Sequence, residues 1–166
     1  MERLWTPWRL AYVTAASHQD VECVFCDAQR HADEAPSLIV HEGRSCFVIL
    51  NLYPYNNGHL MVVPRRHVGR LADLTTDEMD ELMRLTRASE MALEARYRPH
   101  GFNMGLNLGK PAGAGVLDHL HMHVVPRWNG DTNFMTVVGE TRVLPEELHV
   151  TAAHLSPLVA QFAAPR

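Results

Sequence analysis

Three histidines alternate with apolar residues in the segment His119-Leu120-His121-Met122-His123-Val124-Val125. Successive side chains of a strand point to opposite faces, so a strand here places all three imidazoles on one face. Neighbouring imidazoles disfavour one another's protonation, so at least one stays neutral near pH 7 with a nitrogen lone pair. A neutral imidazole is a good nucleophile toward phosphorus. The central His121 is therefore the candidate nucleophile, with His119 and His123 placed to orient it and to donate hydrogen bonds.

Two other interpretations of the same segment compete with this one. A single histidine in a strand is usually structural, although three in alternation fit that interpretation poorly. A His-x-His pair on a strand is equally typical of a zinc site, and ligation of a water-activating zinc by all three imidazoles is the chemical rival.

A glycine-rich segment precedes the histidines and favours phosphate chemistry. Gly109, Gly113 and Gly115 surround Lys110, and such backbone can approach a phosphate closely and point N–H groups at it. The segment is not a Walker loop, because Pro111 follows the lysine and no helix opens there. Taken alone it would be a plain hairpin connection, but its position next to the three histidines favours an anion site.

The elements that must position these residues can be predicted from the pattern of apolar residues. A helix is expected over 75–97, because Thr75 and Glu78 fit a capping box and apolar residues recur at helical spacing. That stripe, expected to pack in the core, comprises Met79, Leu82, Met83, Thr86, Leu93 and Tyr97. Strands are expected at 37–40, 46–52, 58–64, 102–108 and 119–126, with a reversal at Asn57-Gly58. About five strands without regular strand–helix alternation predict an α+β fold with an antiparallel sheet, one long helix and a shorter C-terminal helix after 145–147.

Composition limits the class of protein. A chain of 166 residues with 46% hydrophobic and 20% charged residues is typical of one globular domain. The net charge of -4 argues against nucleic-acid binding, which usually needs an excess of basic residues. Without an apolar run of about 18 residues or a signal-peptide core, we expect no membrane association and a cytoplasmic location.

Several separated motifs resemble the histidine triad (HIT) superfamily. They are the His-φ-His-φ-His-φ-φ pattern at 119–125, the upstream Asn-x-Gly-x-x-Ala-Gly at 107–113, His59 within Gly-His-Leu-Met-Val-Val-Pro, and Pro64-Arg-Arg-His67. The continuation over 118–134 and Trp5-Thr-Pro-Trp-Arg9 resemble the bacterial branch of diadenosine tetraphosphate phosphorylases and ATP adenylyltransferases. The resemblance implies a HIT-like fold, with residues 1–166 forming a single HIT domain that has N- and C-terminal extensions.

The same resemblance implies roles for individual residues. His121 would attack the α-phosphate, while His119, His123 and His59 complete the catalytic set. Residues that would hold the nucleoside, ribose or phosphates are Asn51, Asn107, Gly113, Ala114 and Gly115. The chain departs from other branches before His119, where the spacing is one residue longer and a hydroxyl is missing, so Lys110 or Asn133 is the substitute contact for the leaving group.

The pair Cys23-Val-Phe-Cys26 has the spacing of two ligands of one zinc ion. A structural site needs four ligands, and the resemblance implies that His67 and His119 supply the other two. Such a zinc would be structural, because four protein ligands leave no open position for water. The alternative is a reduced cysteine pair without a metal.

The resemblance implies phosphorolysis of a dinucleoside polyphosphate, with inorganic phosphate as acceptor and a nucleotidyl-histidine intermediate. A HIT hydrolase that uses water on dinucleoside polyphosphates or nucleoside phosphoramidates is the alternative within the same class. A scaffold protein that binds AMP without turnover is the alternative outside it. No redox cofactor is expected, a divalent cation such as magnesium is compatible with the substrate phosphates, and a homodimer or higher homo-oligomer is implied.

Overall fold

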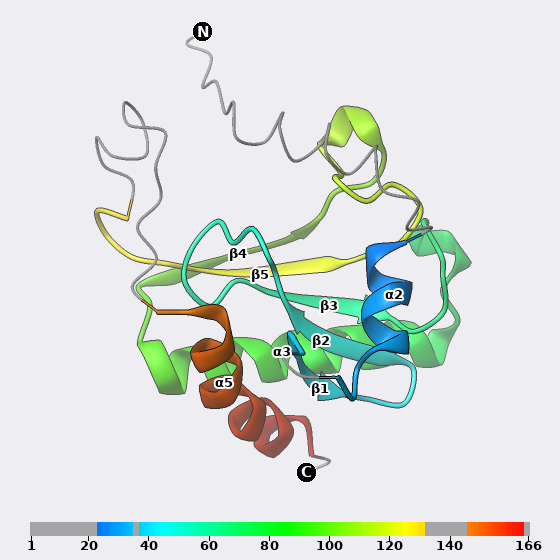
Figure 1. Cartoon of the computed structure of the whole chain (residues 1–166). Helices are drawn as coiled ribbons and strands as arrows, with labels where there is room; N and C mark the ends of the chain where they lie inside the picture. Colours follow the sequence, from blue (N-terminus) through cyan, green and yellow to red (C-terminus); the bar gives the residue numbers. More distant parts are fainter. Residues whose placement is uncertain (1–22, 35–36, 132–145, 165–166) are drawn as a thin grey trace, which may run out of the picture.

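The computed structural model describes residues 23–34, 37–131 and 146–164. Within them the chain forms a five-stranded antiparallel sheet in the order β1-β2-β3-β5-β4. The strands are β1 (Ile39–Glu42), β2 (Cys46–Leu50), β3 (Leu60–Pro64), β4 (Gly101–Leu106) and β5 (Met122–Arg127). The α-helices of the described residues are α2 (Val24–Arg30), α3 (Thr76–Tyr97) and α5 (Leu148–Ala163). This arrangement confirms the predicted α+β class, the antiparallel sheet, the long helix and the C-terminal helix (Figure 1).

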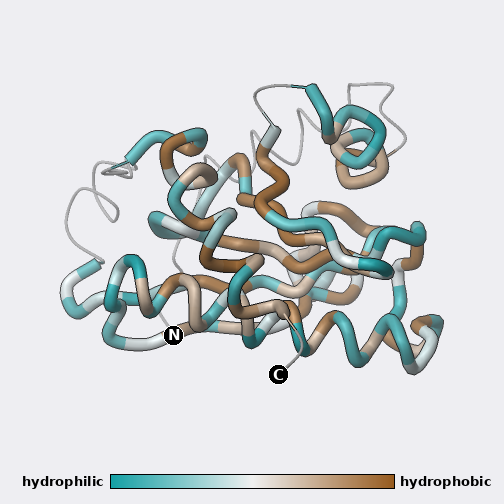
Figure 2. The backbone as a smooth tube through the Cα atoms, turned by 90° about the horizontal axis from the view of Figure 1, so that it is seen from below, coloured by the Kyte–Doolittle hydropathy of each residue, from teal (hydrophilic) through white to brown (hydrophobic). Residues whose placement is uncertain are grey.

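The helices α3 and α5 pack against each other and against one face of the sheet (Figure 1). Burying each large aliphatic side chain there contributes about 1.5–3 kcal/mol. This core includes Val48, Leu60, Val62, Leu82, Leu85, Leu93, Leu120, Val124, Leu155 and Val159. In Figure 2 the most hydrophobic stretches of the tube lie in the central strands, and hydrophilic stretches lie toward the outside.

The helix α3 begins at the predicted capping box. The Thr75 side chain accepts a hydrogen bond from the Glu78 backbone N–H, and the Glu78 carboxylate accepts one from the Thr75 N–H. The Arg66 guanidinium donates two hydrogen bonds to the same carboxylate, at 2.8 and 2.9 Å. These bonds, from Arg66 above all, lower the pKa of Glu78 to about 2, against the opposing effect of burial. The carboxylate therefore joins the start of α3 to the loop after β3.

The prediction that Met79 and Met83 of α3 pack in the core was wrong. Met79 and Met83 are 38% and 54% exposed. The buried side of the helix includes Leu85, Ala88 and Ala92 together with the predicted Leu82 and Leu93, and these residues recur at helical spacing. Helical spacing alone could not distinguish the two sides, because apolar residues occur on both.

A second, smaller apolar cluster covers the opposite face of the sheet. Phe47, Ile49, Met61 and Val63 point to this face from β2 and β3, and Phe25 of α2 packs against them. Because side chains alternate along a strand, His59 lies on the same face as Met61. The register pairs Met61 with His123 across β3 and β5, which brings a triad histidine to the same face.

The predicted strands are all present, but their ends differ. β1 starts two residues later and carries a register irregularity, and β2 and β4 each end two residues earlier than predicted. β5 starts at Met122, so His119 and His121 lie just before the strand. Pro64 ends β3 opposite this point and has no N–H to extend the ladder, and the Leu120 N–H donates instead to the Val68 carbonyl at 2.7 Å.

The turn between β2 and β3 contains the predicted Asn57-Gly58 reversal. Gly58 has φ of +75°, and a Cβ atom there would lie 2.8 Å from a side-chain carbon of Leu93. Only glycine fits this position without strain.

No helix of the described ranges is both long and apolar enough to cross a bilayer.

Candidate functional site

The three triad histidines lie together on the face of the sheet covered by α2. The Phe25 ring contacts both His119 and His121, with ring centroids 5.4 and 5.0 Å away, and the centroid of His121 lies 4.9 Å from that of His123. All three histidines are buried, with at most 9% of their surface exposed. The intervening Leu120 points to the opposite core. The structure thus brings the three imidazoles together even though His119 and His121 precede the strand.

The His121 ring is oriented by a main-chain carbonyl. Its Nδ1 lies 2.8 Å from the His119 carbonyl oxygen. A carbonyl only accepts hydrogen bonds, so Nδ1 carries the proton and Nε2 carries the lone pair. Burial lowers the pKa of His121, which outweighs the opposite effect of the bond to the His119 carbonyl. His121 is therefore a neutral imidazole with a nucleophilic Nε2.

His59 fixes the tautomer of His123. The Tyr55 backbone N–H donates to His59 Nδ1 at 3.1 Å, so this nitrogen carries the lone pair and His59 Nε2 carries the proton. His59 Nε2 lies 2.9 Å from His123 Nδ1 and donates to it. His123 therefore carries its own proton on Nε2. The network makes His123 a hydrogen-bond donor beside the nucleophilic ring of His121.

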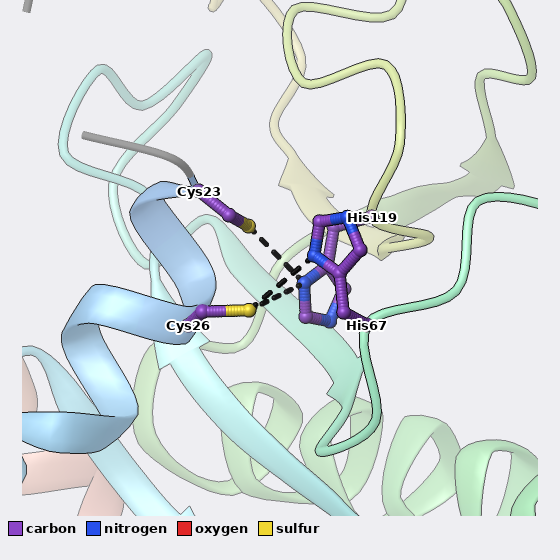
Figure 3. Close-up of side chains that lie close together, drawn as sticks. All are labelled: Cys23, Cys26, His67 and His119. Atoms are coloured by element: carbon purple, nitrogen blue, oxygen red, sulfur yellow. Dashed lines mark hydrogen bonds between the residues drawn. The ribbon is translucent and has the colours of Figure 1, made fainter. Parts of the chain in front are cut away.

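Cys23, Cys26, His67 and His119 form a second cluster next to the triad (Figure 3). One ligand atom from each lies within 4.8 Å of all the others. His119 Nδ1 is 3.2 Å from Cys23 Sγ, and His67 Nδ1 is 3.4 Å from Cys26 Sγ. Figure 3 shows the sulfur of Cys23, the residue before α2, and the sulfur of Cys26 in α2 pointing at the two rings. This gathers the whole predicted ligand set in one place.

The donor set fits a tetrahedral zinc ion. His119 Nε2 donates to the Pro64 carbonyl at 2.8 Å, which leaves Nδ1 with a lone pair facing the thiols. A carbonyl on the far nitrogen is the usual support for a metal-ligating histidine. Burial opposes ionisation of Cys23, but its contacts with His119 and with two backbone groups lower its pKa to about 6. A thiolate is the form of cysteine that binds zinc.

The same contacts argue against the rival in which one zinc binds all three triad histidines. Both ring nitrogens of His119 face other partners, the thiols and the Pro64 carbonyl. His121 and His123 each direct Nδ1 to a carbonyl or to another ring. The triad is therefore divided, with His119 turned to the cysteines and the other two to each other.

A search against known protein families finds a match to the HIT domain over residues 32–130, which includes His59, His67 and the triad. The chain belongs to the HIT family.

Three proteins that are similar to this HIT chain bear on its function. It is 46% identical over 158 residues to a Mycobacterium tuberculosis protein named AP-4-A phosphorylase, covering 91% of this chain and 80% of that protein. It is 33% identical over 95 residues to a Schizosaccharomyces pombe bis(5'-nucleosyl)-tetraphosphatase (asymmetrical), covering 57% of this chain and 52% of that protein. A crystal structure of a Zn-bound histidine triad family protein from Mycobacterium smegmatis matches with a TM-score of 0.66 at 26% identity, covering 86% of this chain and 96% of that one.

The glycine-rich segment of this HIT protein forms a compact loop before the triad. Gly109 and Gly113 have φ of +83° and +86° around a 3-10 turn at Lys110–Ala112. The N–H groups of residues 112, 113 and 114 donate to carbonyls of the loop itself, so they brace the loop. Lys110 and Gly115 are exposed, Asn107 is half-buried and Ala114 is buried.

Asn51 lies beside His59, which contacts the triad. Its Nδ2 is 3.3 Å from His59 Nδ1, and its Oδ1 accepts the Tyr53 N–H at 2.9 Å. It therefore supports the turn that carries His59. Asn133, the other predicted substrate contact, lies outside the described residues.

Three side chains near the site were missed in the sequence. Phe25 forms a wall for two triad rings, and Tyr55 lies 4.7 Å from His59 and 5.9 Å from His123, measured between ring centroids. Asp131 accepts a hydrogen bond from Asn56 in the turn before His59. Only Phe25 had a local signal, because it is the aromatic residue inside the Cys-x-x-Cys pair.

Proposed function

We propose that this HIT protein cleaves dinucleoside polyphosphates by phosphorolysis, converting diadenosine tetraphosphate and phosphate into ADP and ATP. The observation that carries the proposal is the His121 ring, held by the His119 carbonyl so that its unprotonated Nε2 is the nucleophilic atom. The similarity to the Mycobacterium tuberculosis protein named AP-4-A phosphorylase supports the choice of substrate.

The reaction proceeds in two displacements. His121 Nε2 forms a bond to the α-phosphorus, and the bond from that phosphorus to the bridging oxygen breaks, which releases ATP. The attacking imidazole becomes cationic, and the His119 carbonyl that accepts its Nδ1–H stabilises this charge. Inorganic phosphate then attacks the same phosphorus, breaks the phosphorus–nitrogen bond and leaves as part of ADP.

His123 stabilises the departing oxygen. Its Nε2–H donates a hydrogen bond to that oxygen, which leaves as part of the ATP anion without taking the proton, and His59 Nε2–H holds His123 in this tautomer through His123 Nδ1. This assigns to His123 the role of the hydroxyl that is missing before His119. Asn107, Lys110, Asn133 and the 113–115 loop are the proposed phosphate and ribose contacts. A magnesium ion on the phosphates is compatible with this scheme.

We also propose that Cys23, Cys26, His67 and His119 hold a structural zinc ion. Four protein ligands leave no position for a reacting water, so the ion would stabilise the fold near the site. The distances among the four donor atoms and the Zn-bound neighbour from Mycobacterium smegmatis support this assignment. When bound, zinc would fix the orientation of His119, whose carbonyl orients His121.

The test measures products with and without inorganic phosphate. The proposal expects ADP and ATP from diadenosine tetraphosphate only when phosphate is present, and near-complete loss of turnover in His121→Ala with retained folding. His149→Ala is the matched control, because that side chain is 62% exposed and belongs to α5. Turnover retained in His121→Ala would refute the assignment of the nucleophile.

A hydrolase is the second candidate, favoured by the similarity to the Schizosaccharomyces pombe tetraphosphatase. Water would then attack the adduct, and the products would be AMP and ATP whatever the phosphate concentration. Tight AMP binding without turnover of any polyphosphate would favour the scaffold alternative instead.

A further inference from the structure

A charged network at the end of β5 holds the turn between β2 and β3. Asn56 Nδ2 in this turn donates to the Asp131 carboxylate at 2.8 Å and to the Pro126 carbonyl at 3.2 Å. Arg127 donates two hydrogen bonds to the same carboxylate, at 2.6 and 2.8 Å, and the Trp128 N–H donates a third at 3.1 Å. Two segments 75 residues apart in sequence are thus joined at one end of the sheet (Figure 1).

The carboxylate of Asp131 is suited to hold this turn permanently. Its side chain is only 11% exposed and lies between the guanidinium of Arg127 and the amide of Asn56. The hydrogen bonds from Arg127 outweigh burial and hold the pKa of Asp131 well below its usual range. The group therefore remains an ionised acceptor under any condition in which the enzyme would act.

The turn that Asp131 holds is also the turn that sets the tautomer of His59. Asn56 lies next to Tyr55, whose N–H donates to His59 Nδ1, and the Asn56 carbonyl accepts the His59 N–H at 3.2 Å. A shift of Asn56 thus moves both backbone groups that contact His59.

The donors that face His59 Nδ1 decide which way the histidine relay donates. With the Tyr55 N–H at 3.1 Å and Asn51 Nδ2 at 3.3 Å on Nδ1, His59 donates from Nε2 to His123, and His123 keeps its proton on Nε2. Without the Tyr55 N–H, only the longer contact from Asn51 holds the lone pair on Nδ1, so the tautomer of His59 with its proton on Nδ1 gains population. In that tautomer His59 Nε2 accepts, His123 donates from Nδ1, and His123 Nε2 loses the N–H that would donate a hydrogen bond to the leaving group.

We propose that Asp131, acting through Asn56, is a positioning residue that holds His123 in the tautomer that donates to the leaving group. The inference rests on the proposed function, because it concerns the hydrogen-bond donor to the leaving group of that reaction. The Asp131 carboxylate reaches this turn through the side chain of Asn56, so its effect on His123 is transmitted by the turn. An acidic side chain that follows β5 thereby contributes to the chemistry at His123.

The test compares Asn56→Ala with the wild-type protein and with Asn129→Ala, an exposed asparagine near the same strand end. Nitrogen-15 NMR of labelled histidine identifies which ring nitrogen of His59 and of His123 carries the proton, without substrate. We expect the wild type and Asn129→Ala to show both protons on Nε2 and Asn56→Ala to show a mixture. We also expect kcat to fall roughly 10- to 100-fold in Asn56→Ala with little change in KM. Asp131→Asn, which keeps an acceptor oxygen for Asn56, should recover most of kcat relative to Asp131→Ala.

Two results would overturn the proposal. One is an Asn56→Ala protein with the wild-type tautomers at both rings, whether or not its stability or kcat has fallen, because the network is then only structural. The other is a changed tautomer with unchanged kcat. If Asn56→Ala does not fold, the Asp131→Asn and Asp131→Ala pair gives the same two readouts. A wild-type protein that turns over no dinucleotide refutes the proposed function instead, and the NMR result still decides whether the network sets the tautomer.

Discussion

Phe25 joins the cysteine–histidine cluster, the triad and the sheet, so its truncation is an informative perturbation. The side chain is 4% exposed and packs against the cluster formed by Phe47, Ile49, Met61 and Val63. Replacing a buried phenylalanine by alanine costs about 3–5 kcal/mol of unfolding free energy. We expect about 3 kcal/mol for Phe25→Ala, the lower end, because α2 is a helix of only 7 residues that can shift toward the cavity.

The same change should loosen α2 locally. Apart from Phe25, the described contacts that hold this helix to the sheet include the cysteine–histidine contacts and a hydrogen bond from the Gln29 side chain to the Arg65 carbonyl at 3.1 Å. Because the Phe25 ring forms a wall for His119 and His121, turnover should fall as well. Faster hydrogen exchange over residues 24–30 would report the loosening.

Urea unfolding at a fixed zinc concentration measures the cost. Phe25→Leu should lose about 1 kcal/mol, since it keeps most of the apolar volume. Val24→Ala is the matched control on the same helix, because Val24 is 48% exposed and such substitutions usually change stability by less than about 0.5 kcal/mol. The reasoning is refuted if Phe25→Ala costs no more than Val24→Ala, or if exchange over residues 24–30 is unchanged.

Three further results are expected. The purified protein should carry about one zinc ion per chain by elemental analysis. Cys26→Ser should lose the ion, and Cys46→Ala should keep it, because the Cys46 thiol lies in the core between the sheet and the helices α3 and α5. Wild-type protein without zinc would contradict the site. Glu78 has a folded pKa of about 2 against an unfolded value near 4.5, so its ion pair and cap stabilise the fold above pH 4.5 and lose that effect as pH falls toward 2. Glu78→Gln should therefore flatten the dependence of the unfolding free energy on pH in that window. An unchanged slope would count against the assignment. Gly58→Ala should cost about 1–3 kcal/mol, because of its positive φ and the close core side chain, while Gly101→Ala, which has open space around it, should cost less in the same thermal melts.

Sequence patterns predicted the features of this fold that depend on residues within a few positions of one another. The alternation of histidine with apolar residues placed Leu120 and Val124 in the core and the imidazoles on the other face. The capping box at Thr75 and the reversal at Gly58 follow from side-chain chemistry within a few residues, and both are confirmed. The zinc ligand set came from the family resemblance, and the structure brings its four members together.

The remaining features depend on contacts between segments distant in sequence. β5 starts at Met122 because Pro64 of the neighbouring strand cannot continue the ladder, which no pattern within 119–126 shows. The tautomer of His123 depends on His59, which lies 64 residues earlier and whose Nδ1 faces the Tyr55 N–H and the Asn51 amide. The exposure of Met79 depends on which side of α3 meets the sheet, and both sides carry apolar residues.

The central claim is that His121 carries the nucleotidyl group during turnover. Rapid acid-free quenching of the protein with diadenosine tetraphosphate in the absence of phosphate, followed by peptide mapping by mass spectrometry, tests it directly. The account predicts an adenylyl group on the peptide that contains His121, its absence in His121→Ala, and its release as ADP when phosphate is added. Turnover at the full rate with no adduct on the protein, or an adduct on another residue, would contradict it.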